Sequence, residues 1–192
     1  METTSKPYLS LQIPLSAERQ VAIIERQIEE ITLAIQEAKA DKGDRYTIKQ
    51  MENTKKTLQT RLEKLNDASR KDDVVTFEQL GVDRLFVDES HYYKNLFLHT
   101  KMRNVAGIAQ SEAQKSSDMF AKCQYLDELT GGKGIIFATG TPISNSMTEL
   151  YTNMRYLQYD TLQQMGLGHF DAWASSFGFI AVTNQHALIT VF

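Results

Sequence analysis

The sequence predicts an α/β protein in which part of a parallel sheet is joined to a long antiparallel helical hairpin. Two long segments, residues 16–40 and 47–68, have the apolar periodicity of amphipathic helices. Two short apolar runs further along are separated by a long helical segment, which is the order of parallel strands joined by a crossover. The chain has 192 residues and 42% hydrophobic residues, enough for one domain with a packed core and an appendage.

The first predicted helix, residues 16–40, begins at Ser16, whose hydroxyl is suited to cap its first turn. Its apolar residues recur at alternating steps of three and four, which is the period of a coiled-coil seam. They are Val21, Ile24, Ile28, Ile31, Ile35 and Ala38. Gly43 then predicts a turn.

The second predicted helix, residues 47–68, begins with a capping box formed by Thr47 and Gln50. Its seam has the same spacing, with one charged interruption. The seam residues are Ile48, Met51, Lys55, Leu58, Leu62 and Leu65. Because the turn between the helices is short, we expect an antiparallel hairpin about 33–37 Å long.

The remaining elements have clear start and stop signals. Capping patterns at residues 76–79, 111–114 and 146–149 predict three helix starts, and Gly81 and Gly131 predict helix ends. Residues 84–87 predict a short buried strand, and residues 134–138 predict a second apolar strand. We also expect a helix over 170–177 and a β-rich tail after residue 180.

These elements predict four parts: a leader or remnant strand (1–15), the helical hairpin (16–70), an α/β region (71–178) and a divergent or truncated tail (179–192). The single cysteine, Cys123, excludes an intrachain disulfide and suits a cytoplasmic protein. No signal peptide or membrane span is predicted. A net charge of −3 argues against a chain that binds nucleic acid over its whole surface, but it allows a local basic face.

The candidate catalytic residues follow the first predicted strand. Asp88 and Glu89 are adjacent carboxylates placed where parallel sheets bind ligands. An Asp there can hold a Mg²⁺ that bridges nucleotide phosphates, and the next residue can orient or deprotonate the attacking water. Taken alone, the dipeptide also fits a solvated loop.

The residues around this acidic box resemble a known motif. Leu85 to Asn95, including His91 and the Lys94-Asn95 pair, resembles the Walker B box of superfamily-two helicases, and specifically of the Swi/Snf-type branch. Phe137 to Asn145 resembles the next motif of that branch, a strand leading into Thr-Gly-Thr-Pro. The two motifs occur in the expected order, each at a predicted strand end.

The resemblance implies a RecA-like domain of the P-loop NTPase type, with Mg²⁺ and ATP as cofactors and double-stranded DNA as partner. Asp88 would hold Mg²⁺, Glu89 would be the catalytic base, and His91 would relay polar contacts between the motifs. The second motif would couple the nucleotide state to domain closure and nucleic-acid contact. Its residues are Thr139, Gly140, Thr141, Pro142 and Asn145.

Residues 14–178 also resemble a segment of the large helicase–DNA-methylase fusions of phages and conjugative elements. In those proteins a helical hairpin interrupts the helicase core just before the acidic box. The α/β region would then be the C-terminal part of the first RecA-like domain. The remainder of the helicase or methylase polypeptide would be its partner.

The phosphate-binding half of such an ATPase is missing from the sequence. No Gly-x-x-x-x-Gly-Lys-Ser/Thr loop is present, and Gly131 to Gly134 has the wrong spacing and precedes a strand. The second motor domain with its arginine finger is also absent. We therefore expect negligible ATP hydrolysis by this chain alone.

The hairpin has an uneven charge distribution. Residues 45–71 hold eight Lys or Arg and three Asp or Glu, whereas the first helix is acidic. The two helices could pair their charges across the seam, or the basic helix could contact phosphates. The candidate nucleic-acid contacts are Lys55, Lys56, Arg61, Lys64 and Lys94, with Lys49 and Arg70 on the same basic segment.

Two classes of function follow from these motifs. The first is a fragment of a DNA-dependent ATPase or helicase motor, whose parent is an ATP hydrolase. The alternative is a non-enzymatic coiled-coil interaction module, or a split subunit with an incomplete ATP site.

Overall fold

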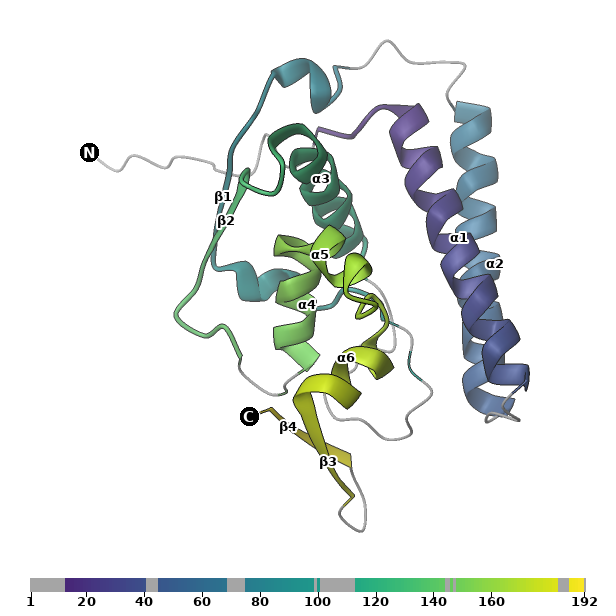
Figure 1. Ribbon diagram of the computed structural model, residues 1–192. Helices are drawn as coiled ribbons and strands as arrows, with labels where there is room; N and C mark the ends of the chain where they lie inside the picture. The colour runs from purple at the N-terminus through teal and green to yellow at the C-terminus, as the bar shows by residue number, and fades with distance from the viewer. Residues whose placement is uncertain are drawn as a thin grey trace.

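The computed structural model describes residues 13–40, 45–68, 75–98, 100, 113–143, 146, 148–182 and 187–191. A helical hairpin lies along one side of a body that holds a short parallel sheet and four helices (Figure 1). A small antiparallel ribbon formed by β3 (Gly178–Val182) and β4 (Ala187–Val191) follows the body, as expected for the β-rich tail. The leader strand predicted within residues 1–15 lies almost wholly outside the described residues.

The hairpin consists of α1 (Ala17–Ala40) and α2 (Arg45–Ala68), and its predicted seam is confirmed. The buried seam residues are Ile24, Ile31, Ile35 and Ala38 on α1 and Met51 and Leu58 on α2. Ser16 caps α1, since its Oγ accepts a hydrogen bond from the backbone N–H of Arg19 at 3.4 Å.

The capping box predicted at Thr47 is wrong, because α2 already begins at Arg45 and Thr47 lies within its first turn. A capping hydroxyl contributes only about 1 kcal/mol. Extending α2 by two residues at its start adds hydrogen bonds to a helix that has already nucleated. The free energy gained by this extension competes with the free energy of the cap.

The parallel sheet pairs β1 (Leu85–Asp88) with β2 (Ile135–Ala138), from Leu85 opposite Ile135 to Asp88 opposite Ala138. Helix α3 (Gln114–Thr130) belongs to the long connection between the two strands, and η1 (Glu78–Leu80) precedes β1. Both strands were predicted within one residue of these bounds, but the first was predicted to be buried and β1 is buried on one face only, since Phe86 and Asp88 are exposed. The sheet positions the site because parallel neighbours end at the same edge.

Helix α3 starts later than its predicted cap at Ser111. Its N-cap is Ala113, which makes no side-chain cap bond and has extended backbone angles. The Ala113 N–H instead donates to the Asn95 carbonyl at 3.1 Å, so a tertiary contact decides where the helix begins. The predicted end is confirmed, with Gly131 at φ 65° in the left-handed region.

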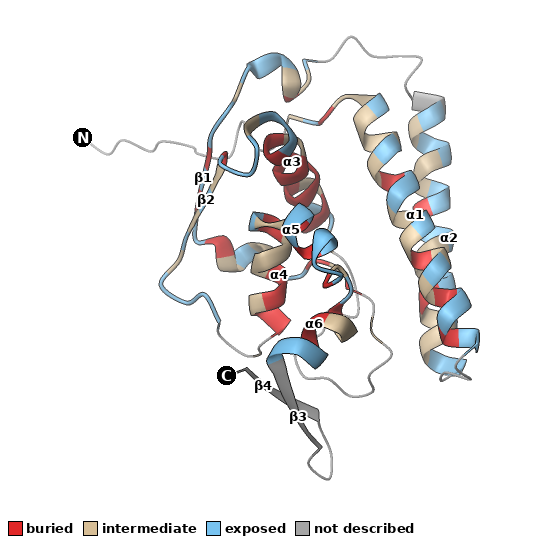
Figure 2. Cartoon of the chain, viewed as in Figure 1, coloured by how far each residue is buried: buried red, intermediate tan, exposed pale blue. Residues whose placement is uncertain are grey.

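Helix α3 is buried on nearly all sides (Figure 2) and forms the centre of the larger core. Cys123 is buried within it, and burial raises the pKa of its thiol, as suits a structural residue. This core joins α3 to the sheet, to Phe77 just before η1 and to Leu15 just before α1. Its buried members are Leu15, Phe77, Leu85, Val87, Leu96, Met119, Phe120, Ala121, Cys123, Leu126, Tyr156 and Tyr159.

A second core lies among the last three helices, α4 (Thr148–Leu157), α5 (Tyr159–Gln164) and α6 (Phe170–Phe177). Tyr151, Phe170 and Trp173 form its aromatic centre, with ring centroids 5.3–6.0 Å apart. The helix predicted over 170–177 is confirmed, whereas α5 was not predicted.

The described residues are mostly helical, and their parallel sheet has two strands. A larger RecA-like sheet therefore stays a prediction. Among the described helices, none combines the length and apolar character needed to cross a membrane.

Candidate functional site

The two sequence motifs meet at one edge of the parallel sheet. Asp88 is the last residue of β1 and lies opposite Ala138, the last residue of β2. Glu89 and Thr139 are the next residues along their strands. The strand order thus brings together residues that are about fifty positions apart in the sequence.

Glu89 adopts an unusual backbone conformation. With φ 52° and ψ 45°, it is the non-glycine residue with positive φ among those described. This left-handed region costs a residue with a side chain about 1 kcal/mol or more, and such strain is concentrated at functional sites. The Glu89 N–H donates to Asp88 Oδ1 at 2.9 Å, and the 3₁₀ helix η2 (Ser90–Tyr93) starts immediately afterwards.

His91 joins the two motifs. Its Nδ1 lies 3.1 Å from Glu89 Oε2 and 3.2 Å from Thr139 Oγ1. A protonated Nδ1 can donate to the carboxylate, and an unprotonated Nδ1 can accept from the threonine hydroxyl. The imidazole can therefore change partner between the acidic box and the second motif.

The turn after β2 is stabilised by its own side chains. Thr139 Oγ1 accepts a hydrogen bond from the Thr141 N–H at 3.1 Å, and Asn153 Nδ2 donates to the Pro142 carbonyl at 3.0 Å. Gly140, Thr141 and Pro142 are exposed. Asn145, the last predicted residue of this motif, lies outside the described residues.

Lys94 connects the segment after the acidic box to the helix after the turn. Its Nζ lies 3.1 Å from Glu149 Oε1, and the Glu149 side chain is only 8% exposed. Helix α4, which carries Glu149, is positioned by Ser146, whose Oγ accepts from the Thr148 N–H at 3.2 Å. Lys94 was predicted to contact nucleic acid; the structure gives it an intramolecular partner, and the predicted contact stays a prediction.

Phe97 follows the acidic box, where the sequence predicted an aromatic residue that either packs this segment over the sheet or stacks on bases. It packs against the hairpin cluster of Ile31, Ile35, Ala38 and Met51. Its carbonyl accepts a hydrogen bond from Arg155 Nη1 at 2.6 Å. The segment after the acidic box therefore contacts both the hairpin and α4.

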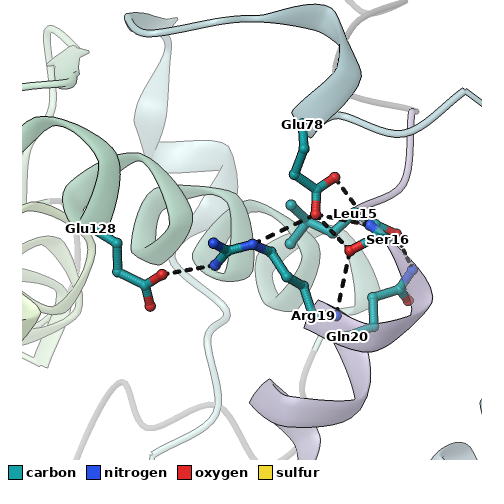
Figure 3. A network of polar contacts seen from close by, with 6 residues as sticks. All are labelled: Leu15, Ser16, Arg19, Gln20, Glu78 and Glu128. Carbon is teal, nitrogen blue, oxygen red and sulfur yellow. Dashed lines mark hydrogen bonds and ion pairs between the residues drawn. The ribbon is translucent and has the colours of Figure 1, made fainter.

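A polar network fixes the start of the hairpin to the body (Figure 3). Glu78 accepts hydrogen bonds from Ser16 Oγ at 2.8 Å and from the Ser16 N–H at 3.1 Å. Arg19 lies 3.7 Å from the same carboxylate and donates to Glu128 at 2.7 Å. Burial opposes ionisation of Glu78, but the hydrogen bonds from its own backbone, Ser16 and Thr76 outweigh it and lower its pKa.

The acidic box suits a weakly coordinated Mg²⁺. Among the described residues, no group of three or more His, Cys, Asp or Glu could enclose a metal ion. Asp88 Oδ1 already accepts the Glu89 N–H, and both residues are exposed. Mg²⁺ typically keeps several waters and binds one or two carboxylates together with substrate phosphates, which is the arrangement that Asp88 and Glu89 can offer.

The candidate contacts on α2 are not equivalent. Lys56 and Lys64 are exposed, whereas Lys55 and Arg61 are half-buried. Lys49, also exposed, completes the basic part of the outer face, and Arg70 lies outside the described residues.

The model of the family described as "Probable helicase domain" matches residues 8–188. This match covers most of the chain, and the chain therefore belongs to that helicase-related family.

Among characterised proteins, the chain is similar to defense against restriction protein B of Escherichia phage P1. The two are 30% identical over 105 residues, which is 53% of this chain and 5% of the phage protein. The chain thus spans a small part of that relative's length. No solved structure matches the chain.

Proposed function

We propose that this chain is part of an ATP-driven DNA motor of the Swi/Snf-type helicase branch and carries the residues that act in ATP hydrolysis. The observation that supports this most strongly is the position of His91 Nδ1, within 3.2 Å of both the Glu89 carboxylate and the Thr139 hydroxyl. A solvated loop after a strand would not need a strained glutamate hydrogen-bonded through histidine to the neighbouring strand end.

In this proposal each residue has one task. Asp88 would hold Mg²⁺, and the ion would supply charge neutralisation at the nucleotide phosphates. Glu89 orients the attacking water and accepts its proton. His91 and Thr139 exchange hydrogen bonds as the site changes state, and Lys94 and Glu149 keep the two motif segments in register.

A second candidate, compatible with the first, is a split or incomplete site that further polypeptide completes. It rests on the uncovered face of the sheet, where Phe86 and Ile136 lie opposite each other and are 71% and 45% exposed. The sequence also has no phosphate-binding loop. The natural cover is more of the same motor domain, which would add strands, the phosphate-binding loop and the opposing arginine.

The metal part of the proposal is tested by titrating the ¹⁵N-labelled chain with Mn²⁺ as a paramagnetic substitute for Mg²⁺. We expect the amide signals of residues 88–92 and 139–141 to broaden before all others as Mn²⁺ is added. In the Asp88→Asn variant, these signals should no longer broaden before the others. Asp83→Asn is the matched control, because Asp83 is an exposed carboxylate just before the same strand. Equal broadening around Asp83 and Asp88, or broadening that survives Asp88→Asn, would refute the assigned metal site.

The incomplete-site part is tested by measuring ATP turnover. We expect the purified chain to hydrolyse Mg-ATP no faster than background. Turnover that Glu89→Gln abolishes would show that the chain completes the site without further polypeptide.

A further inference from the structure

The hairpin separates charge between its two helices. On α1, Glu18, Glu25, Glu29 and Glu37 are exposed, whereas the outer face of α2 is basic. In Figure 1 the hairpin stands at the edge of the molecule, so that the far side of α2 is not covered by the body. This helix face is therefore available to a partner.

The exposed face of α2 has a consistent chemistry. Residues at steps of three and four share one side of a helix. The exposed residues along the midline of this face are Lys49, Asn53, Lys56, Thr60 and Lys64, with Tyr46 beside them at 70% exposure. Two exposed acidic residues lie on or beside this face: Glu52, which is paired with Lys39, and Glu63, which is seven residues after Lys56 and therefore on the same side of the helix.

Charge pairing within the hairpin does not use these lysines. Between α1 and α2, Lys39 Nζ pairs with Glu52 Oε1 at 2.8 Å, so that the acidic helix supplies the base and the basic helix supplies the acid. Within the described parts of the chain, Lys49, Lys56 and Lys64 have no ion-pair partner. Complementary charges across the seam therefore do not explain the basic residues of α2.

We propose that this outer face of α2 binds the sugar-phosphate backbone of duplex DNA, as a contact separate from the candidate ATP site. The proposal rests on the DNA-motor function proposed above for its partner. It replaces the six-residue basic segment expected from sequence with a narrower set, Lys49, Lys56 and Lys64, because these three lysines are exposed whereas Lys55 and Arg61 are half-buried.

The side chains on this face suit phosphate better than a protein surface. Lysine, asparagine, threonine and tyrosine are residue types that contact DNA phosphates. A protein interface needs a desolvated apolar centre, and apart from Tyr46 this face has no large apolar side chain. At 1.5 Å per residue, Lys49 to Lys64 covers about 22 Å, the length of six or seven base pairs.

The acidic surface of α1 restricts the DNA contact to the α2 side of the hairpin. A duplex on the α2 side meets lysines, and a duplex on the α1 side meets exposed glutamates. DNA bound by the motor would therefore meet the hairpin along one helix only, which would orient the hairpin on the duplex.

The test measures binding of the 192-residue chain to a fluorescent 30-base-pair duplex of arbitrary sequence. We expect Lys49→Glu, Lys56→Glu and Lys64→Glu together to weaken binding at low salt by at least about tenfold and to reduce the salt slope of the affinity by about three. Arg26→Glu, Arg84→Glu and Lys133→Glu together make the same charge change at exposed positions elsewhere and should preserve most of the binding. Circular dichroism checks that both variants fold.

The outcomes separate this inference from the proposed function. Equal losses in the two triple variants, or no salt-dependent binding by the unmodified chain, would overturn the inference and leave the metal test of the acidic box unaffected. Failure of the metal test, with DNA binding lost only in the α2 variant, would refute the ATP site alone. Loss of self-association instead of DNA binding in the α2 variant would identify a second copy as the partner and would also overturn the inference.

Discussion

The ammonium group of Lys94 lies 3.1 Å from the carboxylate of Glu149, and this ion pair joins the two motif segments beyond the sheet edge. Glu149 is 8% exposed, so its charge depends on a nearby partner. Together with the contact between His91 and Thr139, the pair makes two separate connections between segments that follow different strands.

Breaking this ion pair should cost more than breaking a surface pair. We expect Lys94→Met to lower the free energy of unfolding by about 1–3 kcal/mol, because it leaves the Glu149 charge buried without the ammonium group. Glu149→Gln should lower it less, because Lys94 is partly exposed to water. Urea unfolding of both single variants and the double variant gives the coupling energy, and a coupling near zero would contradict the structural role.

Because of Glu78, the free energy of unfolding should decrease at acidic pH. Its pKa is lowered in the folded state, so its contribution is present at neutral pH and is lost as pH falls through that lowered pKa. We expect Glu78→Gln to reduce the free energy of unfolding by about 1–2 kcal/mol at pH 7 and by less below pH 4.

The matched control for Glu78 is Glu128→Gln, which removes the exposed end of the same network. A surface ion pair contributes up to about 1 kcal/mol, so this variant should lose less at every pH. Equal losses in the two variants would show that the Ser16 contacts do not stabilise the start of the hairpin.

Asp127 should have the opposite effect to Glu78 and make the folded chain less stable as pH rises. Burial, and then the nearby Asp160 carboxylate, raises its pKa from 3.8 to about 6, and its Oδ1 is buried without a hydrogen-bond partner in the described structure. Between these values the folded state keeps the proton that the unfolded chain releases. Stability is therefore lost as pH rises through this window and stays lower above it.

We expect Asp127→Asn to increase the free energy of unfolding by about 1–3 kcal/mol at pH 7.5 and to change it little at pH 4. Chemical unfolding at the two pH values measures the difference. A gain of the same size at both would attribute the effect to packing instead of ionisation. Asp160→Asn should give a smaller gain with the same pH dependence.

The open face of the sheet should make the chain associate. Phe86 and Ile136 lie opposite each other in the strand pair and remain exposed, and such a patch favours contact between copies or with missing parts of the domain. We expect Phe86→Thr with Ile136→Thr to increase the monomer fraction in sedimentation velocity, with little loss of stability because threonine suits strands.

Leu129→Thr with Met165→Thr is the control for this prediction, because both residues are exposed apolar side chains outside the sheet. These changes should leave association unchanged. If the control and the sheet variant increase the monomer fraction equally, the uncovered sheet face is not the cause.

Sequence periodicity and turn chemistry predicted most of the elements. The seam of the hairpin, β1, β2, the end of α3 at Gly131 and the helix at Phe170–Phe177 all follow from local rules of spacing and backbone preference. The starts of α2 and α3 were predicted wrongly, because helix growth and the contact between Ala113 and Asn95 compete with side-chain caps of similar energy.

The sequence by itself predicted Asp88, Glu89 and Thr139 as candidate site residues, because their types and order follow short motifs. Only the tertiary structure decided what joins them. The left-handed turn at Glu89, the bridging position of His91, the pairing of Lys94 with Glu149 and the contact of Phe97 with the hairpin connect residues far apart in the chain. Spacing along a chain specifies which face a residue takes within its own element, but packing between elements decides which faces meet.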